Sequence, residues 1–160
     1  MSLPVTMTYI KENVSLIGIS GISPGTSCFT EILSGIAEQS VIVDMINYSS
    51  MPGRDMNFSF SVSDNDLPNV LTSVGKFKIS YPLLHTDVSS RNTKFCFYSD
   101  EMRVKEGVAA GLLKLFEDEQ ISIKLITTSE TEISVLVDDI FAEQIIRLSV
   151  ERLKSKIEVL

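Results

Sequence analysis

Apolar residues along the chain follow two spacings, and the order of these spacings occurs twice. In the first copy an apolar run at Val14–Ser20 predicts a strand, and a helical pattern follows the loop Gly21–Gly25. The apolar face of this helix consists of Phe29, Ile32, Leu33 and Ile36. A strand is then predicted over Val41–Tyr48, a turn at Met51–Gly53, and a strand over 58–62, where apolar residues alternate with serine. A second helix carries Leu67, Val70, Leu71 and Val74, so the predicted order is βαββα.

The second copy repeats this order. A strand is predicted over Thr93–Ser99, followed by a loop that ends at Gly107 and by a helix. The apolar face of that helix consists of Val108, Leu112, Leu115 and Phe116. Strands over Ile121–Thr127 and Ile133–Val137 correspond to the two inner strands of the first copy. Asp138 and Asp139 correspond to Ser63 and Asp64 as the cap of a last helix, which carries Phe141, Ile145, Ile146 and Leu148.

A duplicated βαββα unit predicts an α+β protein of two ferredoxin-like βαββαβ subdomains, each an antiparallel sheet with its helices on one face. Phe77–Leu84 can supply the fourth strand of the first copy, whereas Ile157–Leu160 is short for a strand. The alternating segment Val5–Ile10 belongs to neither repeat and can supply the missing edge of the second copy. The predicted domains are therefore 14–88, and 4–10 together with 93–160.

Composition narrows the classes of function. The 160 residues carry a net charge of −7, which disfavours nucleic acid as a partner. The sequence contains no run of about 18 apolar residues and no signal-peptide pattern, so a cytoplasmic protein that makes no membrane contact is expected. Cys28, Cys96 and the lone His85 have no metal-ligand spacing, and neither a nucleophile motif nor a phosphate-binding glycine motif occurs. No catalytic and no metal-binding residue is predicted.

Two passages resemble a known family. Residues 120–139, QISIKLITTSETEISVLVDD, resemble the strand–turn–strand of the second regulatory ACT domain of aspartate kinases (aspartokinases). The passage Ile32–Ile46, followed by Asn57–Val62, resembles the first ACT domain of the same enzymes. The likeness covers nearly the whole chain, in the order of the family's C-terminal tandem ACT domains.

This resemblance implies an allosteric role rather than catalysis. Tandem ACT domains of this family bind lysine, threonine or both and relay feedback to the kinase that opens aspartate-family amino-acid biosynthesis. They pair as homodimers through ACT–ACT contacts. The kinase domain, an ATP-dependent phosphotransferase to the aspartate side-chain carboxylate, is not in this sequence, so ATP and Mg belong to that absent partner domain and no cofactor is expected here.

The resemblance places effector-binding residues in the first copy. A free amino acid needs donors for its carboxylate, which a helix N-terminus supplies, and an acid for its ammonium. The loop residues predicted to bind the effector are Ser23, Pro24, Gly25, Thr26 and Ser27. The strand residues predicted to bind it are Val43, Asp44 and Met45, with Asp44 as the acid. Ser27 stands where the family has glycine. The alternative is a plain strand-to-helix turn with a hydroxyl cap and an exposed charge at Asp44.

A second predicted cluster lies in the second copy. Strand residues Ser122 and Ile123 would face the loop of a partner chain, and a polar turn offers hydroxyls and a carboxylate. That turn consists of Thr127, Thr128, Ser129 and Glu130. The alternative is an ordinary reverse turn whose side chains close local hydrogen bonds.

Three functions remain open from the sequence. The first is the lysine- or threonine-sensing regulatory part of an aspartate kinase. The second is an ACT dimerisation scaffold that binds no effector, for which the altered Ser23–Ser27 loop is the argument. The third is a stand-alone amino-acid sensor for another enzyme or a transcription factor. All three share the fold and differ in what is bound.

Overall fold

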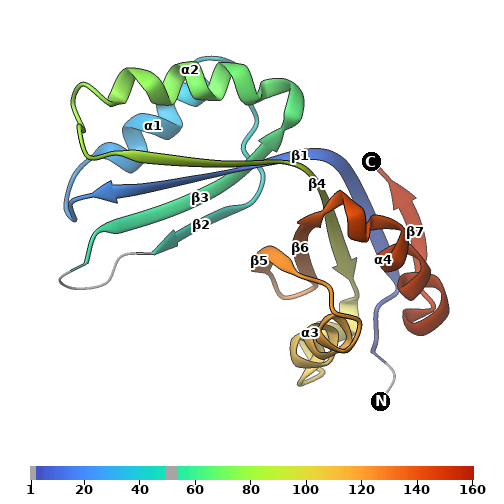
Figure 1. Cartoon of the computed structure of the whole chain (residues 1–160). Coiled ribbons are helices and arrows are strands. Elements are labelled where there is room, and N and C mark those ends of the chain that lie inside the picture. Colours follow the sequence, from blue (N-terminus) through green and yellow to red (C-terminus); the bar gives the residue numbers. More distant parts are fainter. Residues whose placement is uncertain (1–2, 50–53) are drawn as a thin grey trace. The chain divides into compact units, whose positions relative to one another are not determined.

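The computed structural model describes residues 3–49 and 54–160 (Figure 1). The predicted turn at Met51–Gly53 lies outside the described residues. The chain divides into two compact units: the central unit, residues 13–90, and the terminal unit, residues 1–12 and 91–160. The elements are β1 (Met7–Ile22), α1 (Cys28–Ala37), β2 (Ile46–Ser49), β3 (Met56–Ser63), α2 (Leu67–Phe77), β4 (His85–Tyr98), α3 (Val108–Asp118), β5 (Ile123–Thr128), β6 (Glu132–Asp138), α4 (Ala142–Leu148) and β7 (Lys156–Val159).

In the central unit the strand order is β2-β3-β1-β4, with β3 antiparallel to both of its neighbours. Helices α1 and α2 lie on one face of this sheet (Figure 1). Alternate residues of β1 and β3 point toward them, which is why the sequence alternates there between apolar residues and serine. The buried core comprises Ile17, Ile19, Phe58, Phe60 and Val62 from the strands and Cys28, Ile32, Ile36, Val70 and Val74 from the helices.

Strand β2 starts later than the sequence pattern predicts. The prediction was Val41–Tyr48, whereas β2 spans Ile46–Ser49. Just before it, the Asp44 N–H donates to the Ser61 carbonyl and the Met45 carbonyl accepts from the Ser61 N–H, at 3.0 and 2.9 Å. Two residues thus face one on β3, a bulge that interrupts the ladder and that apolar spacing does not reveal.

The predicted fourth strand at Phe77–Leu84 is wrong. Phe77 ends α2, and the following residues form turns in which the Tyr81 N–H donates to Phe77 O at 2.8 Å and the Leu84 N–H to Tyr81 O at 3.0 Å. Pro82 has no N–H to give to a sheet, which favours a turn here. The strand that closes this unit is the first part of β4, from His85 onward.

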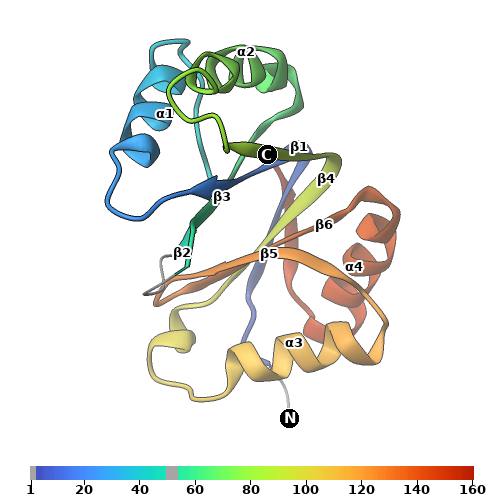
Figure 2. The ribbon, with the colours of Figure 1, turned by 60° about the vertical axis from the view of Figure 1, so that its left-hand side comes forward.

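In the described part of the terminal unit the strand order is β7-β1-β4-β6-β5. β7 pairs in parallel with the start of β1, from Met7 opposite Lys156 to Ile10 opposite Val159. The expectation that the last residues are too short for a strand is therefore wrong, because β1 supplies a ready partner. Helices α3 and α4 lie beside the strands of this unit (Figure 2). They share one core with Phe95, Phe97, Ile133, Val135 and Val137.

Matching hydrogen bonds confirm that the two units repeat one fold. Ser15 Oγ donates to Asp64 Oδ1 at 2.5 Å in the central unit, and Thr93 Oγ1 donates to Asp139 Oδ1 at 2.7 Å in the terminal unit. In both units the hydroxyl lies on the inner strand and the carboxylate follows the next strand of the sheet. The expectation of two α+β subdomains with antiparallel pairing and helices is thus confirmed.

The repeat breaks at one pair of equivalent positions. Asp44 of the central unit corresponds to Lys124 of the terminal unit, where the Nζ atom donates to Asn92 Oδ1 at 2.6 Å and to Asp138 Oδ2 at 3.1 Å. These bonds orient Asp138, whose Oδ1 accepts from the Ile140 N–H at 3.3 Å and caps the short helix η3 (Asp139–Phe141) that precedes α4.

The substitution Lys124→Met is expected to raise the pKa of Asp138. The hydrogen bond from Lys124 lowers this pKa below the ordinary value of an aspartate, and the bond from the Ile140 N–H adds to the shift. Since the folded-state pKa is depressed, the contribution to stability is present above the unfolded value and is lost as pH falls through the folded one. Carboxyl NMR titration of both proteins measures this shift, and an unchanged pKa of Asp138 contradicts the assignment.

The two cysteines and the possible metal ligands bear on the chemistry that a thiol nucleophile or a metal site requires. Cys28 is a buried thiol and Cys96 is a half-buried one. Burial, and secondarily the Glu31 carboxylate, raises the pKa of the Cys28 thiol to about 11, so it stays protonated at neutral pH. Within residues 3–49 and 54–160, no cluster of histidine, cysteine and carboxylate side chains is suited to a metal ion. None of the helices in these ranges combines the length and the apolar character that a membrane crossing requires.

Candidate functional site

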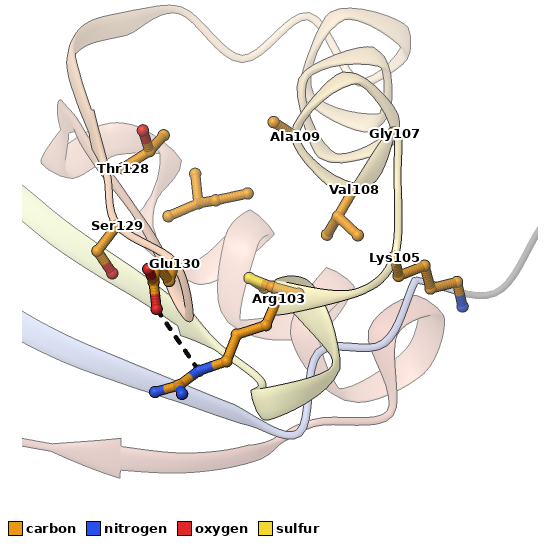
Figure 3. A pocket seen from close by; sticks show the side chains of 10 residues that line it. Arg103, Lys105, Gly107, Val108, Ala109, Thr128, Ser129 and Glu130 are labelled. Carbon is orange, nitrogen blue, oxygen red and sulfur yellow. Dashed lines mark ion pairs between the residues drawn. The ribbon is translucent and has the colours of Figure 1, made fainter.

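A pocket of about 450 Å³ opens in the terminal unit where three segments meet. These are the short helix η2 (Asp100–Arg103) after β4, the start of α3, and the turn between β5 and β6 (Figure 3). Its size falls in the range of small-molecule sites. The lining consists of Met102, Arg103, Lys105, Gly107, Val108, Ala109, Thr128, Ser129, Glu130 and Ile133.

Arg103 is held on one side of the pocket by the end of β4. The Ser99 Oγ accepts from the Glu101 N–H at 3.2 Å and caps η2, and the Tyr98 hydroxyl donates to Asp100 at 2.9 Å. The Ser99 N–H donates to Thr131 O at 2.9 Å. This last bond joins the start of η2 to the β5–β6 turn itself, so the two polar sides of the pocket are fixed to one another.

Glu130 stands at the tip of the opposite turn. The turn is closed by the Ser129 N–H, which donates to Glu132 O at 2.9 Å. The Ser129 Oγ accepts from the Glu132 N–H at 3.1 Å and from the Thr131 N–H at 3.4 Å. Because the oxygen acts as an acceptor in the turn, the hydroxyl proton of Ser129 is left to donate elsewhere.

An ion pair joins the two sides. Arg103 Nε lies 3.9 Å from Glu130 Oε2, and the two side chains are 60% and 82% exposed (Figure 3). An exposed pair at this distance contributes little to stability. A zwitterion can therefore enter between the two groups, with its carboxylate on the guanidinium and its ammonium on the carboxylate.

The start of α3 adds donors to the same pocket. Gly107 precedes the helix with φ of 76°, a left-handed conformation that favours glycine. Among the described residues no side chain caps this end of α3, and its first turn contains no acid. The first N–H groups of a helix, together with its dipole, attract a carboxylate.

Comparison with known proteins agrees with this geometry. A family model described as an ACT domain matches residues 96–147, which include the pocket-forming segments. This chain carries an ACT domain. The matched segment contains the end of β4, α3, β5, β6 and most of α4, and the central unit repeats its topology.

Curated proteins that match most of the chain are aspartokinases. The chain is 26% identical over 131 residues to the aspartokinase of Geobacillus stearothermophilus and 22% identical over 129 residues to aspartokinase 2 of Bacillus subtilis. Each match covers 81% of this chain, but the chain spans only 31% of the length of either relative.

Solved structures match over nearly the full chain. A crystal structure of aspartokinase alpha and beta subunits is 27% identical with a TM-score of 0.84, covering 94% of this chain and 99% of that one. The ligand-free regulatory subunit of aspartate kinase from Thermus thermophilus shares the fold, at 19% identity and a TM-score of 0.84, over 93% and 98% of the two chains. The chain therefore resembles the tandem ACT regulatory region of aspartokinase.

The structure brings half of the second predicted cluster into the ACT-domain pocket. Thr128, Ser129 and Glu130 line it, whereas Thr127 is half-buried on β5 and is not in the lining. Ser122 is exposed just before β5, and Ile123, the first residue of β5, is half-buried; neither lines this pocket. Their expected role toward a partner chain stays a prediction.

The first predicted cluster lies in the central unit. Ser23, Pro24, Gly25 and Thr26 are exposed between β1 and α1. Ser27 is the N-cap residue of α1, yet its hydroxyl donates to the Glu31 side chain instead of capping the helix. The other Glu31 oxygen accepts from the Tyr81 hydroxyl at 3.1 Å. The first turn of α1 thus holds a carboxylate of its own beside the N–H groups that a ligand carboxylate would use.

The remaining predicted residues flank the bulge before β2. Asp44 is exposed, Val43 is half-buried against the core of the central unit, and Met45 is buried. Only Asp44 among these three therefore presents a polar side chain to solvent. Its role in ammonium binding stays a prediction.

Sequence reasoning missed the cation and the apolar part of the pocket. Arg103 lies in the stretch Asp100–Lys105, where charged and apolar residues are mixed without periodicity. Val108 and Ala109 were predicted only as helix residues. The available signal was the repeat: the second-copy loop before α3 corresponds to the first-copy loop that was singled out, and it contains Arg103 and Lys105.

Proposed function

We propose that this chain is the regulatory module of an aspartate kinase, which binds lysine or threonine and passes occupancy to the catalytic domain for feedback control. The observation that carries the proposal is the pocket of the ACT domain, where a guanidinium, a carboxylate and a helix N-terminus meet around about 450 Å³. These are the groups that bind a free amino acid. The likeness to aspartokinases over 81% of the chain supports the partner.

Titration calorimetry of the full chain with lysine and with threonine tests this function. Saturable heat with at least one of them is expected, along with a rise in melting temperature, because a ligand that binds only the folded state stabilises it. Glycine, which has the α-ammonium and α-carboxylate groups but no side chain, and acetate, which has only the carboxylate, serve as controls for binding that does not depend on the side chain. If neither amino acid gives heat or a thermal shift, the sensing function is wrong.

One observation favours a second function, a homodimeric ACT scaffold without an effector. In the central unit the hydroxyls of Ser27 and Tyr81 both donate to Glu31, so the polar groups near α1 satisfy one another. This candidate predicts a stable dimer in sedimentation equilibrium that is indifferent to every amino acid. The sensing function predicts a dimer whose stability depends on the ligand.

A further inference from the structure

The lining of the ACT-domain pocket separates into two regions of different chemistry. The rim carries the ion pair of Arg103 and Glu130 together with the Ser129 hydroxyl. The floor is apolar and consists of Met102, Val108, Ala109 and Ile133. Val108 and Ile133 belong to the core of the terminal unit and are only 6% and 4% exposed.

The view into the pocket shows how these regions are oriented. The side chain of Ala109 projects from α3 toward the side of Thr128 and Ser129, and that of Val108 projects from α3 toward the segment that carries Arg103 (Figure 3). Lys105 points away from the other labelled side chains (Figure 3). A zwitterion held between Arg103 and Glu130 would therefore direct its side chain onto the apolar floor.

We propose that this pocket selects neutral amino acids with a short branched side chain, the class of valine and threonine, and rejects lysine. The inference rests on the proposed function, since it names the ligand class of the same site. The inference chooses between the two effectors that the family resemblance implies, because threonine belongs to the accepted class and lysine does not.

Charge accounts for the rejection of lysine. The pocket lining holds a single carboxylate, Glu130, and an α-ammonium group occupies it. The second ammonium of lysine would then lie on four apolar side chains without a counter-ion. An unpaired charge on such a surface is strongly unfavourable.

Shape and polarity account for the preference among neutral ligands. A β-branched side chain places two groups on Val108 and Ile133, whereas alanine places one. An added methyl group in a hydrophobic pocket changes affinity about 10-fold or more, and such a pocket discriminates weakly against an isostere that carries a hydroxyl. Valine and threonine should thus bind within about 100-fold of each other, both more tightly than alanine.

Titration of the full chain with valine, threonine, alanine and lysine tests the ligand class, with Ala109→Asp as the diagnostic variant. An aspartate at this position adds a carboxylate to the floor and is compatible with the first turn of a helix. The affinity for valine is expected to fall at least about 10-fold, and lysine is expected to bind. Ala110→Asp is the matched control, because Ala110 is an exposed neighbour outside the pocket lining, and it should change neither affinity.

Methyl NMR of the unmodified chain provides a measurement that does not depend on the variant. Threonine is expected to shift the Val108 and Ile133 methyl signals, and lysine is expected to leave them in place. The proposed ligand class is wrong if lysine binds the unmodified chain as tightly as threonine does. It is also wrong if threonine binds without shifting the two methyl signals and the Ala109→Asp variant binds valine as tightly as the unmodified chain. Absence of binding by every amino acid overturns the proposed function itself.

Discussion

Arg103→Ala is expected to lower the affinity of the chain for an α-amino acid about 10- to 100-fold. A hydrogen bond between a guanidinium and a carboxylate contributes about 1.5–3 kcal/mol, and each 1.4 kcal/mol is a factor of ten in the dissociation constant. The substitution removes the only lining cation directed at the Glu130 side of the pocket. Titration calorimetry with the tightest-binding amino acid measures the change.

Two further variants separate recognition from net charge. Arg147→Ala removes a cation from the exposed surface of α4 and should leave affinity unchanged. Arg103→Lys should recover part of the affinity, because lysine keeps the charge but lacks the two-pronged guanidinium. Equal affinities for Arg103→Ala and the unmodified chain would remove this pocket from the proposed function.

Gly21→Ala is expected to destabilise the central unit by about 3 kcal/mol or more. Gly21 has φ of +74°, a conformation that costs an L-residue about 1–2 kcal/mol. A Cβ atom at this position would also lie 2.1 Å from the backbone oxygen of Leu83. Because a carbonyl of the segment leading into β4 cannot move without disturbing the sheet, the contact adds to the conformational cost.

Gly25→Ala is the matched control. Gly25 has a similar φ of +81°, but nothing lies within 4 Å of the position that its Cβ would occupy. This variant should lose only about 1–2 kcal/mol. Urea titration followed by circular dichroism gives both free energies, and equal losses in the two variants would contradict the close approach at Leu83.

The buried thiol of Cys28 reports on the same unit by an independent route. Cys28 is fully buried in the core of the central unit and its pKa is raised to about 11, so it reacts only after that unit opens. Thiol labelling in a Cys96→Ser background should be faster in Gly21→Ala than in Gly25→Ala.

Periodicity predicted the inner elements of both units because alternate side chains of each strand face the helices of its unit. Phe58, Phe60 and Val62 face the helices, and the intervening serines do not. The sheet edges were predicted poorly. Apolar and polar residues do not alternate clearly at the His85 end of β4 or in the short β7. Both segments form strands because each pairs with β1.

The candidate site was predictable only in its local part. Ser129 and Glu130 stand in a polar turn between two apolar runs, which the sequence displays directly. Arg103 has no such local mark. Its place in the pocket depends on the hydrogen bond from the Ser99 N–H to Thr131 O, which joins residues far apart in the sequence.

The sequence by itself determined the duplication, the α+β class and the identity of the polar turn, because each depends on residues within one element or one turn of the chain. Only the tertiary structure decided which strands close the two sheets and which charge faces Glu130. Both features depend on backbone hydrogen bonds between distant segments. Because nearly every residue carries the same backbone N–H and C=O groups, the sequence does not show which of them pair.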